Sequence, residues 1–125
     1  MRRVSRSALV PFTAEQMFAL VDDVERYPEF VPWCTASKVL KREAGMVEAT
    51  LEMSRGGVHQ RFSTHNESVP GQCMSIALLG GPFKHLEGGW TFTPLGEAGC
   101  KVSLSLDFQF SNRALDALFG RYFEE

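Results

Sequence analysis

The most constraining feature of this sequence is a stretch near its end in which apolar and polar residues alternate one by one. Every second position is apolar, so that Val102, Leu104, Leu106, Phe108 and Phe110 alternate with Lys101, Ser103, Ser105, Asp107 and Gln109. Successive side chains of a β-strand point to opposite faces, and this period of two therefore predicts a strand with one buried face. A helix would instead need apolar residues three and four positions apart.

The same period recurs in the middle of the chain, on both sides of Gly56-Gly57. The inward positions before the turn are Val47, Ala49, Leu51 and Met53, and those after it are Val58, Gln60, Phe62 and Thr64. A Gly-Gly pair between two alternating runs is typical of a β-hairpin. Further strands are predicted over 73–79 and 83–93, separated by Gly80-Gly81-Pro82. The sequence thus predicts an extended antiparallel sheet.

Helical patterns flank this sheet. A strand predicted over 3–10 ends at Pro11, and Thr13 with Gln16 forms a capping-box pattern for a helix. The segment 27–34 has two prolines, which limit it to one short helical turn. A last helix follows the alternating strand, with an apolar stripe of Leu115, Leu118, Phe119, Tyr122 and Phe123. This order predicts an α+β domain with helices on one face of the sheet.

The length of 125 residues predicts a single domain, 1–125. Glu124-Glu125 would place two carboxylates at the negative end of the last helix. The apolar stripe of that helix is also still running where the sequence stops. We therefore expect the C-terminal helix to be truncated.

Charge and cysteine content exclude several classes of protein. The formal net charge is -2, whereas a dedicated nucleic-acid binder usually has a strong basic excess. Cys34, Cys73 and Cys100 are odd in number and widely spaced, which indicates neither a disulfide framework nor a zinc knuckle. No apolar run reaches the roughly 18 residues of a membrane span. We expect a soluble, cytoplasmic protein, with peripheral contact to the inner membrane left open.

Several motifs, in order along nearly the whole chain, resemble those of one family. They are Val10-Pro11-Phe12, Val21-Asp22-Asp23-Val24, Tyr27-Pro28-Glu29-Phe30-Val31-Pro32-Trp33-Cys34, Gly80-Gly81-Pro82-Phe83-Lys84, Gly88-Gly89-Trp90-Thr91-Phe92-Thr93-Pro94, Asp107-Phe108-Gln109-Phe110 and Leu118-Phe119-Gly120. The sequence resembles the coenzyme Q-binding group of the START-like superfamily, which includes polyketide cyclases and Bet v 1-like proteins. Bacterial members of this group are also described as ribosome-association toxins.

The resemblance implies a helix-grip fold, in which a curved antiparallel sheet wraps around a C-terminal helix and two short helices lie between strands 1 and 2. It also implies ubiquinone as a bound ligand, with no cofactor, and a role in respiratory electron transport. A START-like domain of this kind would bind its ligand without catalysis, so we expect that the protein is not an enzyme.

An apolar ligand needs an apolar wall and few polar anchors. The candidate wall residues are Leu51, Met53, Phe62, Leu86, Trp90, Phe92, Leu104, Leu106, Phe108, Leu118 and Tyr122. Gln60 and Thr64 are polar on an otherwise apolar face and are the candidate anchors for a quinone ring; Trp90 and Tyr122 also carry a donor. The alternative is that these side chains pack on each other and leave no cavity. Phe30 and Trp33 either form a gate or membrane-docking lip, or plug the end of the sheet.

Other chemistries lack their signatures in this sequence. His59, His65 and His85 do not have the spacing of a metal site, and no nucleophile elbow occurs. The glycine pairs lack the lysine and hydroxyl of a phosphate-binding loop and are more typical of bends or close backbone approaches in a sheet.

Three functions therefore compete. The first is the binding of ubiquinone or a related prenyl lipid. The second is a toxin that binds the large ribosomal subunit and blocks subunit joining, for which the candidate basic residues are Lys38, Lys41, Arg42, Arg55, Arg61 and Lys84. The third, an aromatase/cyclase that shapes a polyketide, depends on kinship of fold alone. The sequence leaves the oligomeric state open.

Overall fold

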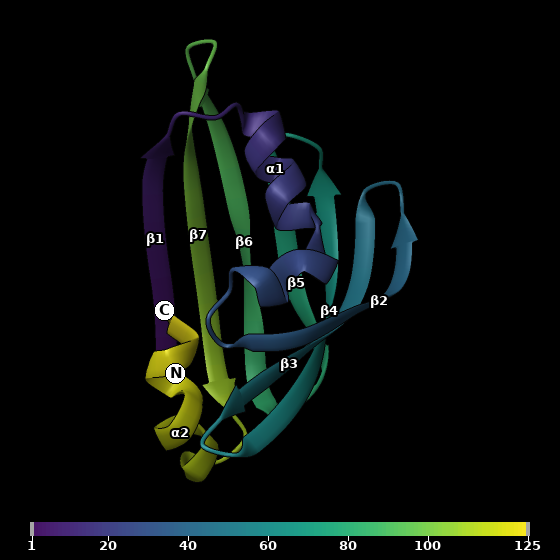
Figure 1. Cartoon of the computed structure of the whole chain (residues 1–125), viewed down its shortest axis with the longest axis vertical. Coiled ribbons are helices and arrows are strands. Elements are labelled where there is room, and N and C mark those ends of the chain that lie inside the picture. Colours follow the sequence, from purple (N-terminus) through teal and green to yellow (C-terminus); the bar gives the residue numbers. More distant parts are fainter. Residues whose placement is uncertain (1, 125) are drawn as a thin grey trace.

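The computed structural model describes the backbone of residues 2–124 and the side chains of residues 2–120. Figure 1 shows a long curved sheet with helices on its concave side. In chain order the elements are β1 (Arg2–Val10), α1 (Ala14–Asp22), the 3-10 helix η1 (Val24–Glu29), β2 (Cys34–Glu43), β3 (Met46–Arg55), β4 (Val58–Val69), β5 (Cys73–Gly80), β6 (Phe83–Leu95), β7 (Gly99–Phe110) and α2 (Arg113–Glu124). This order confirms the predicted fold class, including the two short helices between the first two strands.

The described strands form one seven-stranded antiparallel sheet with the order β1-β7-β6-β5-β4-β3-β2. Each strand from β2 to β7 pairs with its neighbour in sequence, and β1 completes the sheet beside β7. Both edge strands, β1 and β2, therefore come from the N-terminal third of the chain. The helical segment that joins them, α1 followed by η1, lies across the concave face (Figure 1).

Alternation places the predicted apolar positions on the concave face. Along β3, Val47, Ala49, Leu51 and Met53 are buried while the residues between them are partly exposed. The same parity holds in β7, where Leu106, Phe108 and Phe110 are buried. The structure thus confirms both where these strands lie in the sequence and which of their residues face the core.

Helix α1 begins with the predicted capping box. The Gln16 backbone N–H donates to the Thr13 hydroxyl at 3.1 Å, and the Gln16 side-chain oxygen accepts from the Thr13 N–H at 2.9 Å. Phe18 and Val21 then bury one side of the helix against the sheet, and the Phe18 ring meets Phe92 edge-on at 5.7 Å. The cap orients the helix where the chain leaves β1.

We expect Thr13→Ala to lower the free energy of unfolding by about 1 kcal/mol, because it leaves an N-terminal N–H of α1 without its acceptor. Thr13→Ser keeps the hydroxyl and serves as the control, with a smaller loss. Urea denaturation followed by circular dichroism measures both. Equal losses in the two variants would show that the methyl group of Thr13, and not the cap, stabilises this junction.

Helix α2 is anchored at one end of the sheet. The Asn112 side-chain oxygen accepts from the Leu115 N–H at 2.8 Å and caps the first turn of this helix. The Arg2 guanidinium of β1 donates twice to the Asp116 carboxylate, at 2.8 and 3.0 Å, and holds the pKa of that carboxyl below its ordinary value. Phe119 is fully buried and stacks near Phe110. The predicted continuation of this helix beyond residue 125 stays a prediction.

Charged side chains follow the convex face. His65 lies between two carboxylates, with 2.7 Å from its Nδ1 to Glu48 Oε2 and 3.1 Å from its Nε2 to Glu67 Oε1. These hydrogen bonds, first that to Glu48, raise the pKa of His65 above its ordinary value. The folded protein therefore favours the protonated ring more than the unfolded chain does.

This shift predicts a pH-dependent effect of His65→Gln. The contribution of His65 to stability is complete below the unfolded pKa of about 6.5 and is lost as the pH rises through the higher folded pKa. The difference in urea midpoint between wild type and variant should thus be largest near about pH 5.5 and should shrink towards about pH 8.5. A difference that stays constant over this range would show that His65 stabilises the sheet by packing alone.

Candidate functional site

The concave face of the sheet carries two separate groups of buried side chains. The first lies under η1 and α2 and consists of Val4, Val24, Cys34, Val47, Ala49, Leu51, Met53, Phe62, Phe83, Leu86, Leu106, Phe108, Phe110 and Phe119. The second lies under α1 and consists of Ala14, Phe18, Val21, Met74, Phe92, Cys100 and Val102. We call them the lower and the upper cluster.

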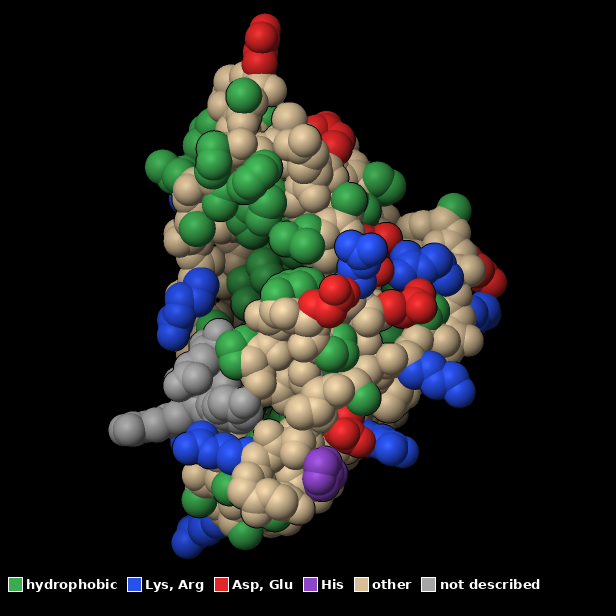
Figure 2. All heavy atoms as spheres, viewed as in Figure 1, with side chains coloured by type: hydrophobic (Ala, Val, Ile, Leu, Met, Phe, Trp, Pro, Cys, Tyr) green, Lys and Arg blue, Asp and Glu red, His purple; other side chains and the backbone are tan. Residues whose placement is uncertain are grey.

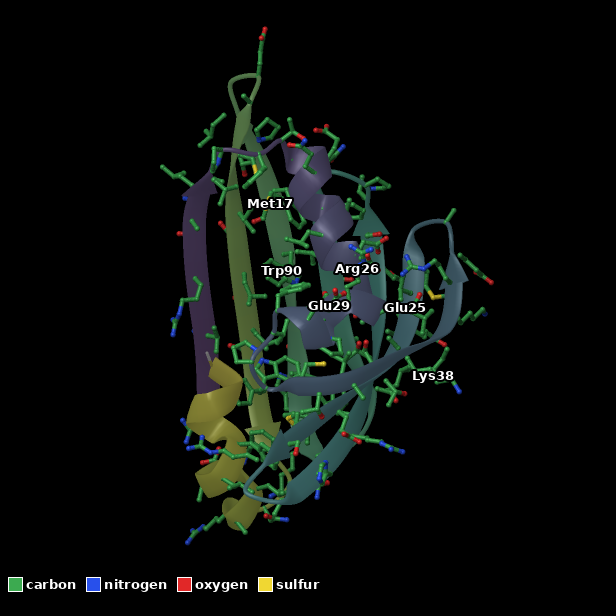
Figure 3. All side chains as sticks on the ribbon, in the orientation of Figure 1. Met17, Glu25, Arg26, Glu29, Lys38 and Trp90 are labelled. Carbon is green, nitrogen blue, oxygen red and sulfur yellow. The ribbon has the colours of Figure 1, made fainter. Side chains whose placement is uncertain are left out.

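Between the two clusters runs one row of side chains that the helices cover only in part. Strand pairing places Arg6, Leu104, Trp90 and Met74 in register across β1, β7, β6 and β5. Met74 is buried, whereas Leu104 and Trp90 are only partly buried. Met17 of α1 also packs at the edge of the upper cluster, and Figure 3 shows it on the same side as Trp90. In the space-filling view hydrophobic atoms are recessed beside α1, and the surface is hollowed there (Figure 2).

We call the surface formed by Met17, Trp90 and Leu104 the concave hollow. Arg6 lies at its β1 edge, on the face that alternation shares with Val4. The Arg6 side chain is exposed and donates at 3.1 Å to the backbone carbonyl of Ser5. Within the part of the chain that the structure describes, no carboxylate forms an ion pair with Arg6.

The predicted wall residues divide between these features. Leu51, Met53, Phe62, Leu86, Leu106 and Phe108 belong to the lower cluster, with Leu118 packed against it, and Phe92 belongs to the upper cluster with Trp90 at its edge. The structure therefore brings most of them together as mutually packed core. Only Trp90 and Leu104 contribute to the concave hollow. The side chain of Tyr122 lies outside the described residues.

The predicted polar anchors lie on the concave face, but away from the hollow. Thr64 is 5% exposed and lies opposite Ala49 and Leu78. Gln60 is partly buried opposite Met53, near the far end of the sheet. Their role as quinone anchors stays a prediction.

Sequence reasoning missed two polar residues on this face. Asn66 follows Thr64 in the same alternation and is 8% exposed; its amide nitrogen contacts the Met74 sulfur at 3.8 Å, and among the described atoms its Oδ1 has no hydrogen-bond partner. Arg6 has the parity of the buried Val4. In both cases the signal was available in the sequence. The alternation of the strand assigns Asn66 and Arg6 to the concave face even though both residues are polar.

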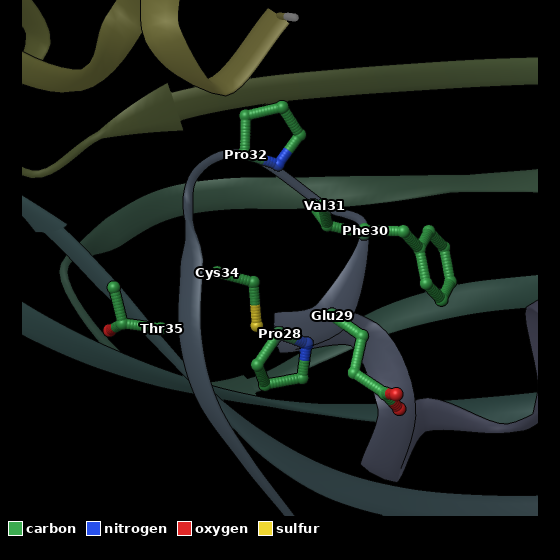
Figure 4. Close-up of a pocket in the computed structure, with 7 residues that line it drawn as sticks. All are labelled: Pro28, Glu29, Phe30, Val31, Pro32, Cys34 and Thr35. Atoms are coloured by element: carbon green, nitrogen blue, oxygen red, sulfur yellow. The ribbon is translucent and has the colours of Figure 1, made fainter.

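The loop from Pro28 to Thr35 forms a shallow surface pocket of about 490 Å³ (Figure 4). Trp33 packs against the lower cluster, 5.9 Å from the Phe62 ring, whereas Phe30 stays 49% exposed beside Tyr27. Of these two aromatic residues, Trp33 therefore plugs the end of the sheet, and Phe30 remains exposed at the surface. Burial raises the pKa of both Tyr27 and Cys34, so neither group is ionised at neutral pH.

A second surface pocket, of about 480 Å³, lies where β6, β7 and the first turn of α2 meet. Its lining includes Lys84 and Arg113, with Arg2 and Asp116 paired at its side. None of the predicted wall residues lines either of these two pockets.

The candidate basic residues are largely neutralised by acids. Arg42 pairs with Asp22 at 2.9 Å, Lys41 with Glu43 at 3.4 Å and Arg61 with Glu52 at 3.2 Å. Lys38 on the edge strand β2 and Lys84 on β6 are exposed. Hydrogen bonds from Thr35 and Arg61 lower the pKa of Glu52, which keeps that carboxylate charged. None of the described helices is long and apolar enough to cross a membrane.

Known proteins resemble this chain along its whole length. It is 50% identical over 125 residues to the ribosome association toxin RatA of Vibrio cholerae, covering 100% of this chain and 87% of that protein. It is 34% identical over 126 residues to the coenzyme Q-binding protein COQ10 homolog B, mitochondrial, of Xenopus laevis, covering 97% of this chain and 51% of that protein.

Among solved structures, the Zhui aromatase/cyclase from Streptomyces sp. R1128 superimposes with a TM-score of 0.82 at 18% identity, over 98% of this chain and 86% of that one. At this identity the likeness shows a shared fold and nothing about activity. Residues 10–125 match the family described as "Polyketide cyclase / dehydrase and lipid transport". With a match over nearly all of its length, and with the helix-grip fold that the sequence predicted, the chain belongs to this START-like family.

Proposed function

We propose that the protein associates with the ribosome, through the large subunit, and blocks the joining of the subunits. The observation that carries this proposal is the 50% identity, over all 125 residues, to a protein named as a ribosome association toxin. The sequence alone ranked ubiquinone binding first. The relatives reverse that order, because the coenzyme Q-binding relative is 34% identical and is covered over only 51% of its length.

The exposed cations of edge strand β2 are the proposed contact with ribosomal RNA. Lys38 and Lys41 are exposed on this strand. Lys41 is 3.4 Å from Glu43, but a surface pair of this kind is weak and can open to meet a phosphate. Contacts between lysines and phosphates release counterions, so the association should weaken steeply as salt increases.

Sedimentation through a sucrose gradient with dissociated ribosomal subunits tests this proposal. We expect the protein to travel with the large subunit at low salt and to remain near the top at high salt. The double variant Lys38→Glu, Lys41→Glu should lose the association, while Lys101→Glu on the convex face of β7 should keep it. A wild-type protein that stays at the top of the gradient at low salt would contradict the proposal.

A second candidate function is the binding of an apolar ligand on the concave face. The specific observation in its favour is the concave hollow, where Trp90 and Leu104 stay partly exposed between two buried clusters. Apolar surface contributes about 25 cal/mol per Å² when it is removed from water, so even a modest hollow can hold a chain of methylene or isoprene units. Ubiquinone is one such ligand, and its binding stays a prediction, as does the absence of catalysis.

Organic extraction of the purified protein, followed by mass spectrometry, tests the second candidate. A co-purified prenyl or acyl lipid at a stoichiometry near one is the expected result. The Leu104→Asp variant places a charge in the hollow and should yield an extract free of that lipid. Equal lipid content in both proteins would show that the lipid is bound elsewhere.

A further inference from the structure

Arg6 stands at the edge of an apolar surface. It is directly opposite Leu104 in the β1–β7 pairing, and Leu104 is directly opposite Trp90 in the β6–β7 pairing. The alternation of β1 puts Arg6 on the same side of the sheet as Val4, which is 4% exposed in the lower cluster. A positive charge and two partly exposed apolar side chains therefore share one row of the concave face.

The charge of Arg6 is uncompensated among the described residues. The other arginines of β1 are paired, Arg2 with Asp116 at 2.8 Å and Arg3 with Asp107 at 2.7 Å. Arg6 donates only to the Ser5 carbonyl of its own strand, which occupies one of its five N–H groups. The remaining donors of Arg6 are available to a partner at the edge of the concave hollow.

We infer that the concave hollow selects an amphipathic anion, namely an acyl or prenyl chain that ends in a carboxylate or phosphate. The chain lies on Met17, Trp90 and Leu104, and the head group pairs with Arg6. The guanidinium fork matches carboxylate and phosphate oxygens in geometry, and hydrogen bonds between charged groups are about twice as strong as neutral ones. This inference rests on the second proposed function and names the class of ligand for that site.

Charge distinguishes this occupant from the alternatives. A neutral quinone offers two carbonyl acceptors but leaves the Arg6 charge uncompensated. A second copy of this chain would have to present an acid at the centre of an apolar contact. Glu29, which precedes the exposed Phe30, lies on η1, a helical segment that covers the same face. A small anion with a tail satisfies both halves of the hollow at once.

Fluorescence of Trp90 tests the inference directly. The background variant Trp33→Phe removes the only other tryptophan, and its emission is titrated with dodecanoate, dodecyl phosphate, decylubiquinone and dodecan-1-ol, each below its micelle concentration. We expect both anions to bind about tenfold more tightly than the alcohol of equal chain length. Arg6→Gln, which removes the charge but keeps a polar chain, should abolish that preference and leave the affinity for the alcohol unchanged.

Arg3→Gln is the matched control, because Arg3 lies on the same strand, three residues before Arg6, and on the opposite, convex face. It should keep the full preference for the anions. Equal affinities for dodecanoate and dodecan-1-ol in the wild-type background would overturn the inference while leaving an apolar-ligand function intact. Binding of none of the four probes would overturn both. An equal loss of preference in Arg3→Gln and Arg6→Gln would overturn it too, since the attraction would then come from net charge and not from this site.

Discussion

Replacing Gly88 with alanine is expected to lower the free energy of unfolding by at least about 3 kcal/mol. A Cβ atom at this position would lie 2.0 Å from the Ser105 carbonyl oxygen and 2.8 Å from the Leu106 Cα, both backbone atoms of β7. Neither atom belongs to a flexible side chain, so β6 and β7 must move apart. The pairing of β6 with β7 runs from Phe83 to Leu95. The edge strand β1 pairs with the other side of β7, so a displacement of β7 also affects β1.

The control for this prediction is Gly80→Ala at the end of β5. A Cβ at Gly80 meets nothing within 4 Å, and its backbone is not in the left-handed region. This variant should unfold within about 0.5 kcal/mol of the wild type. Thermal and urea unfolding, followed by tryptophan fluorescence, give both values. Similar stabilities for the two variants would mean that the sheet is free to open at Gly88 at little cost, contrary to the close approach of its two strands.

The fold class could be predicted from the sequence because three kinds of local signal agreed: the alternation of the strands, the cap of the first helix and the glycine turns. The alternation over 101–110 and the Thr13–Gln16 pair each predict a feature that the structure contains. The expectation that glycine pairs mark close backbone approaches holds at Gly88, and also at Gly89, whose Cβ would lie 2.7 Å from the Met74 carbonyl oxygen. What a single sequence does not contain is the curvature that decides which rows of the concave face a helix covers.

That missing information explains the partial success at the site. Every predicted wall residue that belongs to a strand lies on the concave face, since parity alone sets the face of a strand residue. Parity does not separate Phe108, packed beneath other rings, from Leu104 four residues away, which remains partly exposed. The position of the helices over the sheet makes that distinction, and it depends on contacts far apart in the chain. Arg6 shares the parity of the buried Val4, but its place in one row with Leu104 and Trp90 follows from the β1–β7–β6 register, which a single sequence does not contain.

The two proposed functions use different surfaces of one fold. Ribosome association is assigned to exposed cations on the β2 edge, whereas ligand binding is assigned to the concave hollow beside the β1 edge. These edges are the two ends of the strand order, so substitutions at Lys38 and at Arg6 should act independently. The domain therefore has room for both activities.

Phe108→Ala is expected to destabilise the protein by about 3–5 kcal/mol, the range for removing a fully buried phenylalanine. Phe108 is 0% exposed, and its ring lies edge-on to Phe83 at 6.4 Å and to Phe110 at 5.8 Å. The deletion leaves a cavity beside the rings of Phe83 and Phe110, which stack on each other at 4.5 Å. These two rings cannot move into the cavity without losing that contact.

Leu104→Ala, on the same face of the same strand, is the matched comparison. Its side chain borders the concave hollow, so it buries less area and leaves no enclosed cavity, and the loss should stay below about 1.5 kcal/mol. Urea denaturation of both variants against the wild type measures the difference. Comparable losses would mean that Leu104 is enclosed as tightly as Phe108 and that the hollow is filled by protein, which would remove the surface on which the ligand proposal depends. A large gap between the two losses, in contrast, would show that Phe108 is enclosed core and that Leu104, four positions away on the same strand, borders an open surface.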